Sequence, residues 1–208
     1  MKKLFLLLLL LIITTTVFCQ VVKLKKHYYT IYFHEKQKAP LYTVYILKKA
    51  YITNNPRHGS FKQDTALQND KQASDLVYDS PEYDKGHLTP DADFRFNDTA
   101  EEETFLYTNA APQQEYFNEH LWANVEKHVR DVCLQYGDVK VYTGCLYSSK
   151  KLNGIGIPGY FWKVIVYKNN NRTTKEAFLG KNKKSGSNNY LSIAVKLLNI
   201  EKRTGLHF

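Results

Sequence analysis

The chain has 208 residues, of which 43% are hydrophobic, and a formal net charge of +9 at pH 7. This length and composition suit one domain with a packed core, and no apolar run after Ile13 is long enough to span a bilayer. The positive charge favours a polyanionic partner, but charge alone does not separate nucleic acid from an anionic membrane or a glycan.

The first 19 residues have the pattern of a secretory signal peptide. A basic start at residues 1–3 precedes an apolar run at residues 4–13, which is too short to span a bilayer comfortably, and cleavage before Gln20 is expected. A lipoprotein acylated at Cys19 is the alternative. Phe18 directly before this cysteine fits a lipoprotein signal poorly, so we favour a secreted or periplasmic protein over a lipid-anchored one.

Residues 20–208 are expected to remain as one mature domain, with no stable membrane partner after cleavage. Loss of the two N-terminal lysines lowers its formal charge from +9 to +7. The mature chain keeps two cysteines, Cys133 near the end of a predicted helix and Cys145 late in the following predicted strand. A helix and a strand rise by different amounts per residue, so we favour two separate buried thiols over a disulfide.

The N-terminal half is predicted to be rich in strands. Residues 28–34, 41–47 and 51–53 have β-forming side chains, whereas residues 54–59 are typical of a loop. Residues 60–82 are polar and show little periodicity.

The C-terminal half is predicted to begin with a long helix after Pro112, which suits a first helical turn. Apolar residues recur at helical spacing up to Gly137. After this helix, strands are predicted at residues 139–146, 160–167 and 176–179, and a further helix at residues 191–200. Residues 153–159 and 181–189 are predicted to be loops, and residues 168–172 a turn. Strands, one strong central helix, more strands and a terminal helix indicate an α+β fold.

The segment around His87 has residue types suited to acid–base chemistry. A neutral imidazole can accept a proton from water near neutral pH, and hydrolysis of a phosphodiester needs such a base together with a cation. Asp84 and Lys85 precede His87, and Gly86 is expected to allow a backbone conformation that other residues resist. The simpler alternative is a surface loop with a histidine that has no function.

The predicted central helix carries a second polar set. At about 100° per residue, Asn118 and Glu126 lie roughly 80° apart around the axis, and Arg130 continues the same stripe. These three side chains are therefore expected to face one cleft, with Trp122 between the first two. An amide oxygen and water suit Mg²⁺, and Arg130 suits phosphate. The alternative is a solvated helix with an ordinary Glu–Arg pair.

Three separated blocks of the chain repeat one family pattern in order. Residues Asp84–Pro90 match Asp-Arg-Gly-His-x-x-Pro, residues Asn109–Gln113 match Asn-x-x-Pro-Gln, and Asn118 is followed by Trp122 and Glu126. The chain thereby resembles the DNA/RNA non-specific endonucleases, which are ββα-metal nucleases. The resemblance implies a central antiparallel sheet with a ββα-metal motif and a long central helix.

The resemblance also implies roles for individual residues. His87 corresponds to the general base, Asn118 to the sole direct ligand of a hydrated Mg²⁺, and Glu126 to the residue that holds metal-bound water. Mn²⁺ or another divalent cation is an alternative occupant. Asn109 corresponds to a supporting residue of the site, and Arg130 and Arg57 to phosphate contacts.

Lys85 departs from the arginine that is usual in the family motif. Lysine keeps the positive charge but loses the two-pronged guanidinium contact with phosphate. The implied activity is hydrolysis of DNA and RNA without strong sequence specificity, with both monomer and dimer left open. A protein of the same fold that binds nucleic acid without cutting it is the main alternative. A zinc protein is disfavoured, because the seven histidines match no structural zinc spacing.

Overall fold

The computed structural model describes residues 21–208. The predicted signal peptide at 1–19, the alternative lipid attachment at Cys19 and the expected new N-terminus at Gln20 all lie outside the described residues. Within residues 21–208, no helix combines the length and the apolar character that crossing a bilayer requires.

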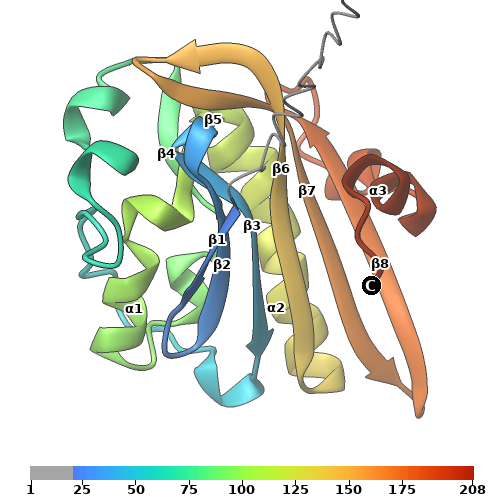
Figure 1. Ribbon diagram of the computed structural model, residues 1–208. Helices are drawn as coiled ribbons and strands as arrows, with labels where there is room; N and C mark the ends of the chain where they lie inside the picture. Colours follow the sequence, from blue (N-terminus) through green and yellow to red (C-terminus); the bar gives the residue numbers. More distant parts are fainter. Residues whose placement is uncertain (1–20) are drawn as a thin grey trace, which may run out of the picture.

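A six-stranded antiparallel sheet runs through the described part of the chain (Figure 1). Its strands, in spatial order, are β1 (Val21–Lys25), β2 (Tyr29–His34), β3 (Ala39–Leu47), β6 (Val139–Leu152), β7 (Ile155–Asn169) and β8 (Arg172–Lys181). A separate antiparallel pair consists of β4 (Tyr83–His87) and β5 (Ala110–Gln114). The helices are α1 (Asp98–Thr104), α2 (Ala123–Tyr136) and α3 (Leu197–Thr204).

The two faces of the large sheet are covered by different helices (Figure 1). Side chains alternate across the pleat of β7, so that Ile165 packs in one cluster with Val129 of α2. Its neighbour Val164 packs in another cluster with Ile200 of α3. This alternation makes the sheet the middle layer between α2 and α3.

The predicted α+β class and central antiparallel sheet are confirmed. The central helix is also present, and Val125, Val129 and Val132 form its buried face as the spacing predicts. Strands occur at all the predicted positions except residues 51–53. There the chain forms a 3₁₀ turn, and the ring of Tyr51 stacks on Phe96 with 4.0 Å between centroids.

The start of the central helix was predicted wrongly. Residues 110–114, including Pro112, form β5 because they pair with β4. Helical structure begins with a π-helical turn at Phe117–Trp122, which continues directly into α2. Proline is tolerated in β5 because this strand pairs only with β4 and leaves its other edge unpaired.

The long hairpin of β6 and β7 extends beyond the predicted strands. Its turn is Asn153-Gly154, and both residues have positive φ, 43° and 96°. An Asn-Gly pair is the strongest short-range hairpin signal, so residues 155–159 belong to β7 and not to the predicted loop.

Other elements also differ from the prediction. Strand β8 is longer than residues 176–179, and β1 and α1 were not predicted. The expected helix at 191–200 is divided into a 3₁₀ turn at Tyr190–Ile193 and α3, which ends at Gly205 with φ of 71°.

The two described cysteines are free and buried, as favoured from the sequence. Burial raises the pKa of the Cys133 thiol to about 11 and that of Cys145 further. Both thiols are therefore protonated and unreactive at neutral pH.

Candidate active site

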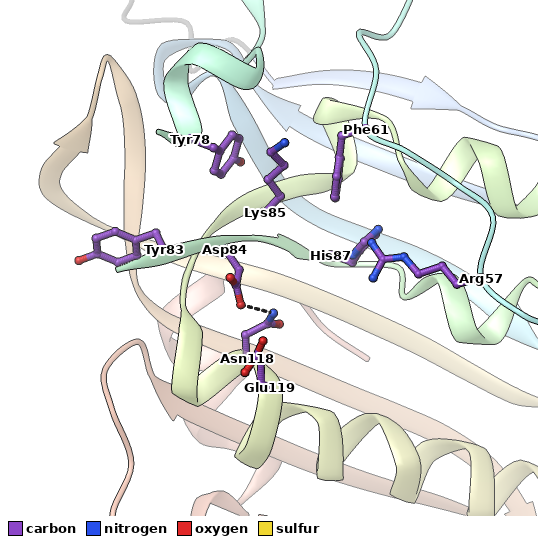
Figure 2. A pocket seen from close by; sticks show the side chains of 9 residues that line it. All are labelled: Arg57, Phe61, Tyr78, Tyr83, Asp84, Lys85, His87, Asn118 and Glu119. Atoms are coloured by element: carbon purple, nitrogen blue, oxygen red, sulfur yellow. Dashed lines mark hydrogen bonds between the residues drawn. The ribbon is translucent and has the colours of Figure 1, made fainter. Parts of the chain in front are cut away.

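A cleft of about 450 Å³ lies where β4 and the start of the central helix approach each other. It brings together four of the residues predicted from the sequence, Arg57, Lys85, His87 and Asn118 (Figure 2). The other side chains that line it are Phe61, Tyr78, Tyr83, Asp84 and Glu119.

His87 occupies the last position of β4, with its ring enclosed by two aromatic side chains. Its centroid lies 4.8 Å from that of Phe61 and 4.9 Å from that of Phe105. Nε2 is buried and has no hydrogen-bond partner within residues 21–208. The ring still contributes to the lining of the cleft, which leaves Nδ1 as the nitrogen directed toward it.

Burial lowers the pKa of His87 from 6.5 to about 4. Asp91 opposes this shift, and the positive charges of Arg57 and Arg95 add to it. His87 is therefore a neutral imidazole at pH 7, which is the form that can accept a proton.

Asn118 and Asp84 form the only pair of lining residues joined by a hydrogen bond in Figure 2. Nδ2 of Asn118 donates to Oδ2 of Asp84 over 2.8 Å. A carboxylate can only accept, so this contact fixes which end of the amide faces Asp84 and leaves Oδ1 for another partner. The amide oxygen beside a carboxylate is a donor set of the hard oxygen type that suits a hydrated divalent cation.

Lys85 lies at the rim of the cleft and contacts an acidic side chain. Its ammonium group donates to Asp75, whose pKa is lowered by this hydrogen bond and by one from Tyr107. The Lys85 ammonium also lies 5.5 Å from the centroid of the Phe61 ring. Lys85 is thus held over the cleft by a carboxylate and an aromatic face.

Arg57 lies beside His87 at one end of the labelled set in Figure 2. Its guanidinium stands 4.7 Å from the centroid of the Phe105 ring, in cation–π geometry. No carboxylate within residues 21–208 forms an ion pair with it, so the guanidinium can bind an anion in the cleft.

Asn109 does not line the cleft but supports the segment that carries His87. Its side chain is fully buried, and Oδ1 accepts from the backbone N–H of Thr89 over 3.0 Å. Nδ2 donates to the carbonyl oxygens of Thr89 and Thr104, each over 2.8 Å. Asn109 therefore joins the segment after β4, the end of α1 and the start of β5.

Glu126 and Arg130 are not among the side chains that line this cleft. The turn from residue 117 to residue 122 is π-helical, so the angle around the axis between Asn118 and Glu126 differs from the roughly 80° of a regular α-helix. Trp122, which the spacing places between Asn118 and Glu126, is fully buried in the core.

Glu126 and Arg130 of α2 belong to a charged cluster that also contains Asp93 and a lysine of β7. Arg130 donates to Asp93 over 3.1 Å, and Tyr45 donates to the other oxygen of Asp93 over 2.6 Å. Burial raises the pKa of Glu126 to about 7, although the positive charges of Lys163 and Arg130 oppose the shift. Glu126 therefore changes charge near neutral pH unless a cation stabilises its ionised form.

Lys163 is a member of this cluster that the sequence reading missed. It is fully buried, and its ammonium donates to Thr143 over 2.8 Å and lies 5.3 Å from the Trp122 ring centroid. Its burial could have been predicted from the sequence, because the alternation of side chains along a strand puts Lys163 on the same face as Phe161 and Ile165. The cleft is also lined by side chains that were not predicted to do so, among them Asp84, Glu119 and Phe61. For Asp84, its place in the motif beside Lys85 could have indicated this role.

Comparison with known proteins adds family membership to this geometry. Residues 12–208 match the model of the DNA/RNA non-specific endonuclease family. The chain belongs to this family. The match covers all of the described residues 21–208, including every residue of the cleft.

Curated relatives carry the names of nucleases. The chain is 29% identical over 204 aligned residues to the mitochondrial nuclease 1 of Schizosaccharomyces pombe, covering 86% of this chain and 63% of that protein. It is 30% identical over 167 residues to nuclease C1 of Cunninghamella echinulata, covering 73% and 66%. It is 28% identical over 124 residues to human mitochondrial endonuclease G, covering 53% and 42%. The matches thus span two thirds or less of these relatives.

A solved structure shares the fold. A chain from the crystal structure of the EndoG/EndoGI complex superposes with a TM-score of 0.82 at 24% identity, covering 89% of this chain and 84% of that one. The agreement confirms the arrangement of sheet and helices described above.

We predict that Asn109→Ala destabilises the fold by about 2 to 4 kcal/mol, because three buried backbone groups lose their partners. The exposed Asn55, whose amide donates only to the Arg95 carbonyl, supplies the control Asn55→Ala, with an expected loss below about 1 kcal/mol. Urea unfolding of both variants measures the difference. Equal midpoints for Asn109→Ala and the wild type would contradict the supporting role.

We predict that the partly buried, neutral His87 makes stability depend on pH below neutrality. Its pKa is about 4 in the folded chain and about 6.5 when unfolded, so the unfolded chain binds the proton first as pH falls. Between pH 7 and pH 4.5, the free energy of unfolding of the wild type should fall by about 2 kcal/mol more than that of His87→Gln, which lacks this titrating group. Urea unfolding at several pH values measures the difference. A gap between the two proteins that is constant with pH would contradict the assignment.

Proposed function

We propose that residues 20–208 form one endonuclease domain that hydrolyses phosphodiester bonds in DNA and RNA without strong sequence specificity. The proposal rests above all on one observation. A histidine held neutral by burial shares a cleft with an asparagine whose amide is oriented by a carboxylate. Family membership and the nuclease relatives support the same activity.

His87 serves as the general base in this proposal. Its Nδ1 takes the proton from the attacking water in the tautomer that carries its proton on Nε2, and the lowered pKa keeps the ring neutral at pH 7. Phe61 and Phe105 restrict rotation of the ring, which keeps Nδ1 directed at the position of the water.

The cleft suits a divalent cation, for which we propose Mg²⁺, with Mn²⁺ or another divalent cation as the alternative. Oδ1 of Asn118 is the direct protein ligand, and Glu126 holds metal-bound water. Asp84 orients the amide through its hydrogen bond to Nδ2. When bound, such a cation stabilises negative charge on the phosphate and on the leaving oxygen.

Cationic side chains orient the substrate phosphate. Arg57 and Lys85 line the cleft and are proposed as phosphate contacts, with Arg130 as a third from the charged cluster under the helix. Contacts to phosphate carry affinity but no sequence information, so this mode of binding accounts for action on both DNA and RNA.

Location follows from the N-terminal segment. We propose that residues 1–19 direct export and are removed, which makes the enzyme secreted or periplasmic, with lipid anchoring at Cys19 as the less favoured alternative.

We predict that the purified protein nicks plasmid DNA and degrades RNA only with a divalent cation, and that His87→Ala lowers the rate by about 10²- to 10⁴-fold. Gel assays with Mg²⁺ and with excess EDTA measure both effects. Unchanged cleavage in EDTA would contradict the proposed mechanism. Binding of DNA without any cleavage by the wild type would favour a nucleic-acid-binding protein instead.

We predict that Asn118→Ala raises the Mg²⁺ concentration required for half-maximal activity. The same variant should weaken Mn²⁺ binding in isothermal titration calorimetry without substrate, because the proposed ligand is lost. Asp84→Asn should weaken binding as well, since an amide can pair with either end of Asn118 and no longer fixes its orientation.

The control is Asn199→Ala, which removes an exposed amide on α3, the helix on the opposite face of the sheet. It should leave Mn²⁺ binding unchanged. If Asn118→Ala binds Mn²⁺ like the wild type, the ligand lies elsewhere.

A further inference from the structure

The segment Lys181–Asn189, which we call the basic loop, presents a cluster of positive charge. Lys181, Lys183 and Lys184 are all exposed. None of the three forms an ion pair with a carboxylate in the described part of the chain. Their charges are therefore available to an external anion.

The basic loop is tied to the body of the protein near both of its ends. Asn182 donates to the carbonyl oxygens of Pro112 and Pro158, over 3.0 and 2.9 Å, and accepts from the backbone N–H of Gln114 over 2.8 Å. Near the other end, the side chain of Asn124 in α2 donates to the carbonyl of Asn188 over 2.9 Å. These contacts hold the lysines in a defined place beside β5 and the central helix.

The basic loop begins next to one end of the cleft. Gln114, which Asn182 contacts, is the direct cross-strand partner of Tyr83. Tyr83 lines the cleft, and Figure 2 shows it at the opposite end from Arg57, with Asp84, Lys85 and Asn118 between them. The lysines therefore continue the cationic lining past the Tyr83 end.

A cation–π contact ties the basic loop to the start of the central helix. The ammonium of Lys184 lies 5.2 Å from the centroid of the Tyr116 ring. Tyr116 precedes Asn118 by two residues and is only partly exposed. The contact holds one charge of the loop close to the entrance of the site while its outer side stays in solvent.

Acidic side chains on the neighbouring surface explain why positive charge in the basic loop favours binding of a polyanion. Asp84 and Glu119 line the cleft, and Glu115 is exposed beside them. These carboxylates suit a cation but repel a long polyanion. Lysines beside them offset this repulsion where the substrate strand leaves the cleft.

We propose that the basic loop binds the phosphate backbone of the nucleic-acid strand beyond the phosphate that is cut, on the Tyr83 side of the cleft. This inference rests on the proposed function. Lysine ammonium groups on flexible stems bind successive phosphates as point charges, without reading sequence. The basic loop therefore contributes affinity for long substrates and has no part in the chemical step.

The test uses two double variants that remove the same charge. Lys183→Gln with Lys184→Gln removes two lysines of the basic loop. Lys23→Gln with Lys25→Gln removes two exposed lysines from β1, and Lys23 makes a similar contact, 5.6 Å from the centroid of the Tyr32 ring. Tyr32 points to the opposite face of the sheet from Ile31 and Phe33, which pack toward α2, so this control lies away from the cleft.

The first measurement is fluorescence anisotropy with a single-stranded oligonucleotide of about 20 nucleotides, in EDTA, over a series of salt concentrations. Each phosphate contact contributes about 0.7 to the slope of log affinity against log salt for a single strand. The variant of the basic loop should therefore show a slope that is shallower by about 1 to 1.5. The β1 control should keep the slope of the wild type.

The second measurement is KM for oligonucleotides of increasing length. The KM ratio of the basic-loop variant to the β1 control should rise with length, because only longer strands reach the lysines. Equal salt slopes, or a ratio independent of length, would overturn the inference while leaving the proposed function intact. Binding without cleavage by the wild type would instead refute the proposed function, and the salt slopes would still test the loop.

Discussion

Close approach of β4 and β5 at Gly86 is the constraint on which the candidate site depends. A Cβ atom at Gly86 would overlap the buried side chain of Gln113 from the paired strand, so only glycine fits. Gly86 is not among the residues with positive φ, and the expectation of an unusual backbone conformation there was wrong. The glycine is needed for space, because it lets the strand that carries Asp84, Lys85 and His87 lie flat against β5.

Pairing of β4 with β5 determines where each functional group points. Side chains alternate along β4, so Lys85 lies on the opposite face of the strand from Asp84. The Asp84 side chain accepts a hydrogen bond from Asn118, at the start of the helix that follows β5. Asn118 lies in the π-helical turn at the start of this helix and lines the cleft, while Arg130 of α2 contacts Asp93. Two strands and one irregular helical turn thus assemble a base, an oriented amide and a cationic rim from distant parts of the sequence.

Burial controls the electrostatics of the candidate site and of the charged cluster. It keeps His87 neutral between Phe61 and Phe105, and it raises the pKa of Glu126 to about 7. Lys163 and Arg130 oppose the second shift, which makes the buried cluster a balance of opposite charges. The lysines of the basic loop provide the complementary feature, since they are exposed and accessible to a long anion.

The sequence by itself determined the residue types of the site, the α+β class and the buried face of α2. Motif identity and apolar periodicity are local properties, which is why His87, Asn118 and the row of valines could be recognised without a structure. Only the tertiary structure decided that residues 110–114 form a strand, because their pairing with β4 overrides the helix-like start at Pro112. It also decided that Asn109 is a buried support, that Arg130 contacts Asp93, and that Asp84 orients Asn118. These features depend on contacts between segments far apart in the chain and on one π-helical turn, and neither is encoded in local spacing.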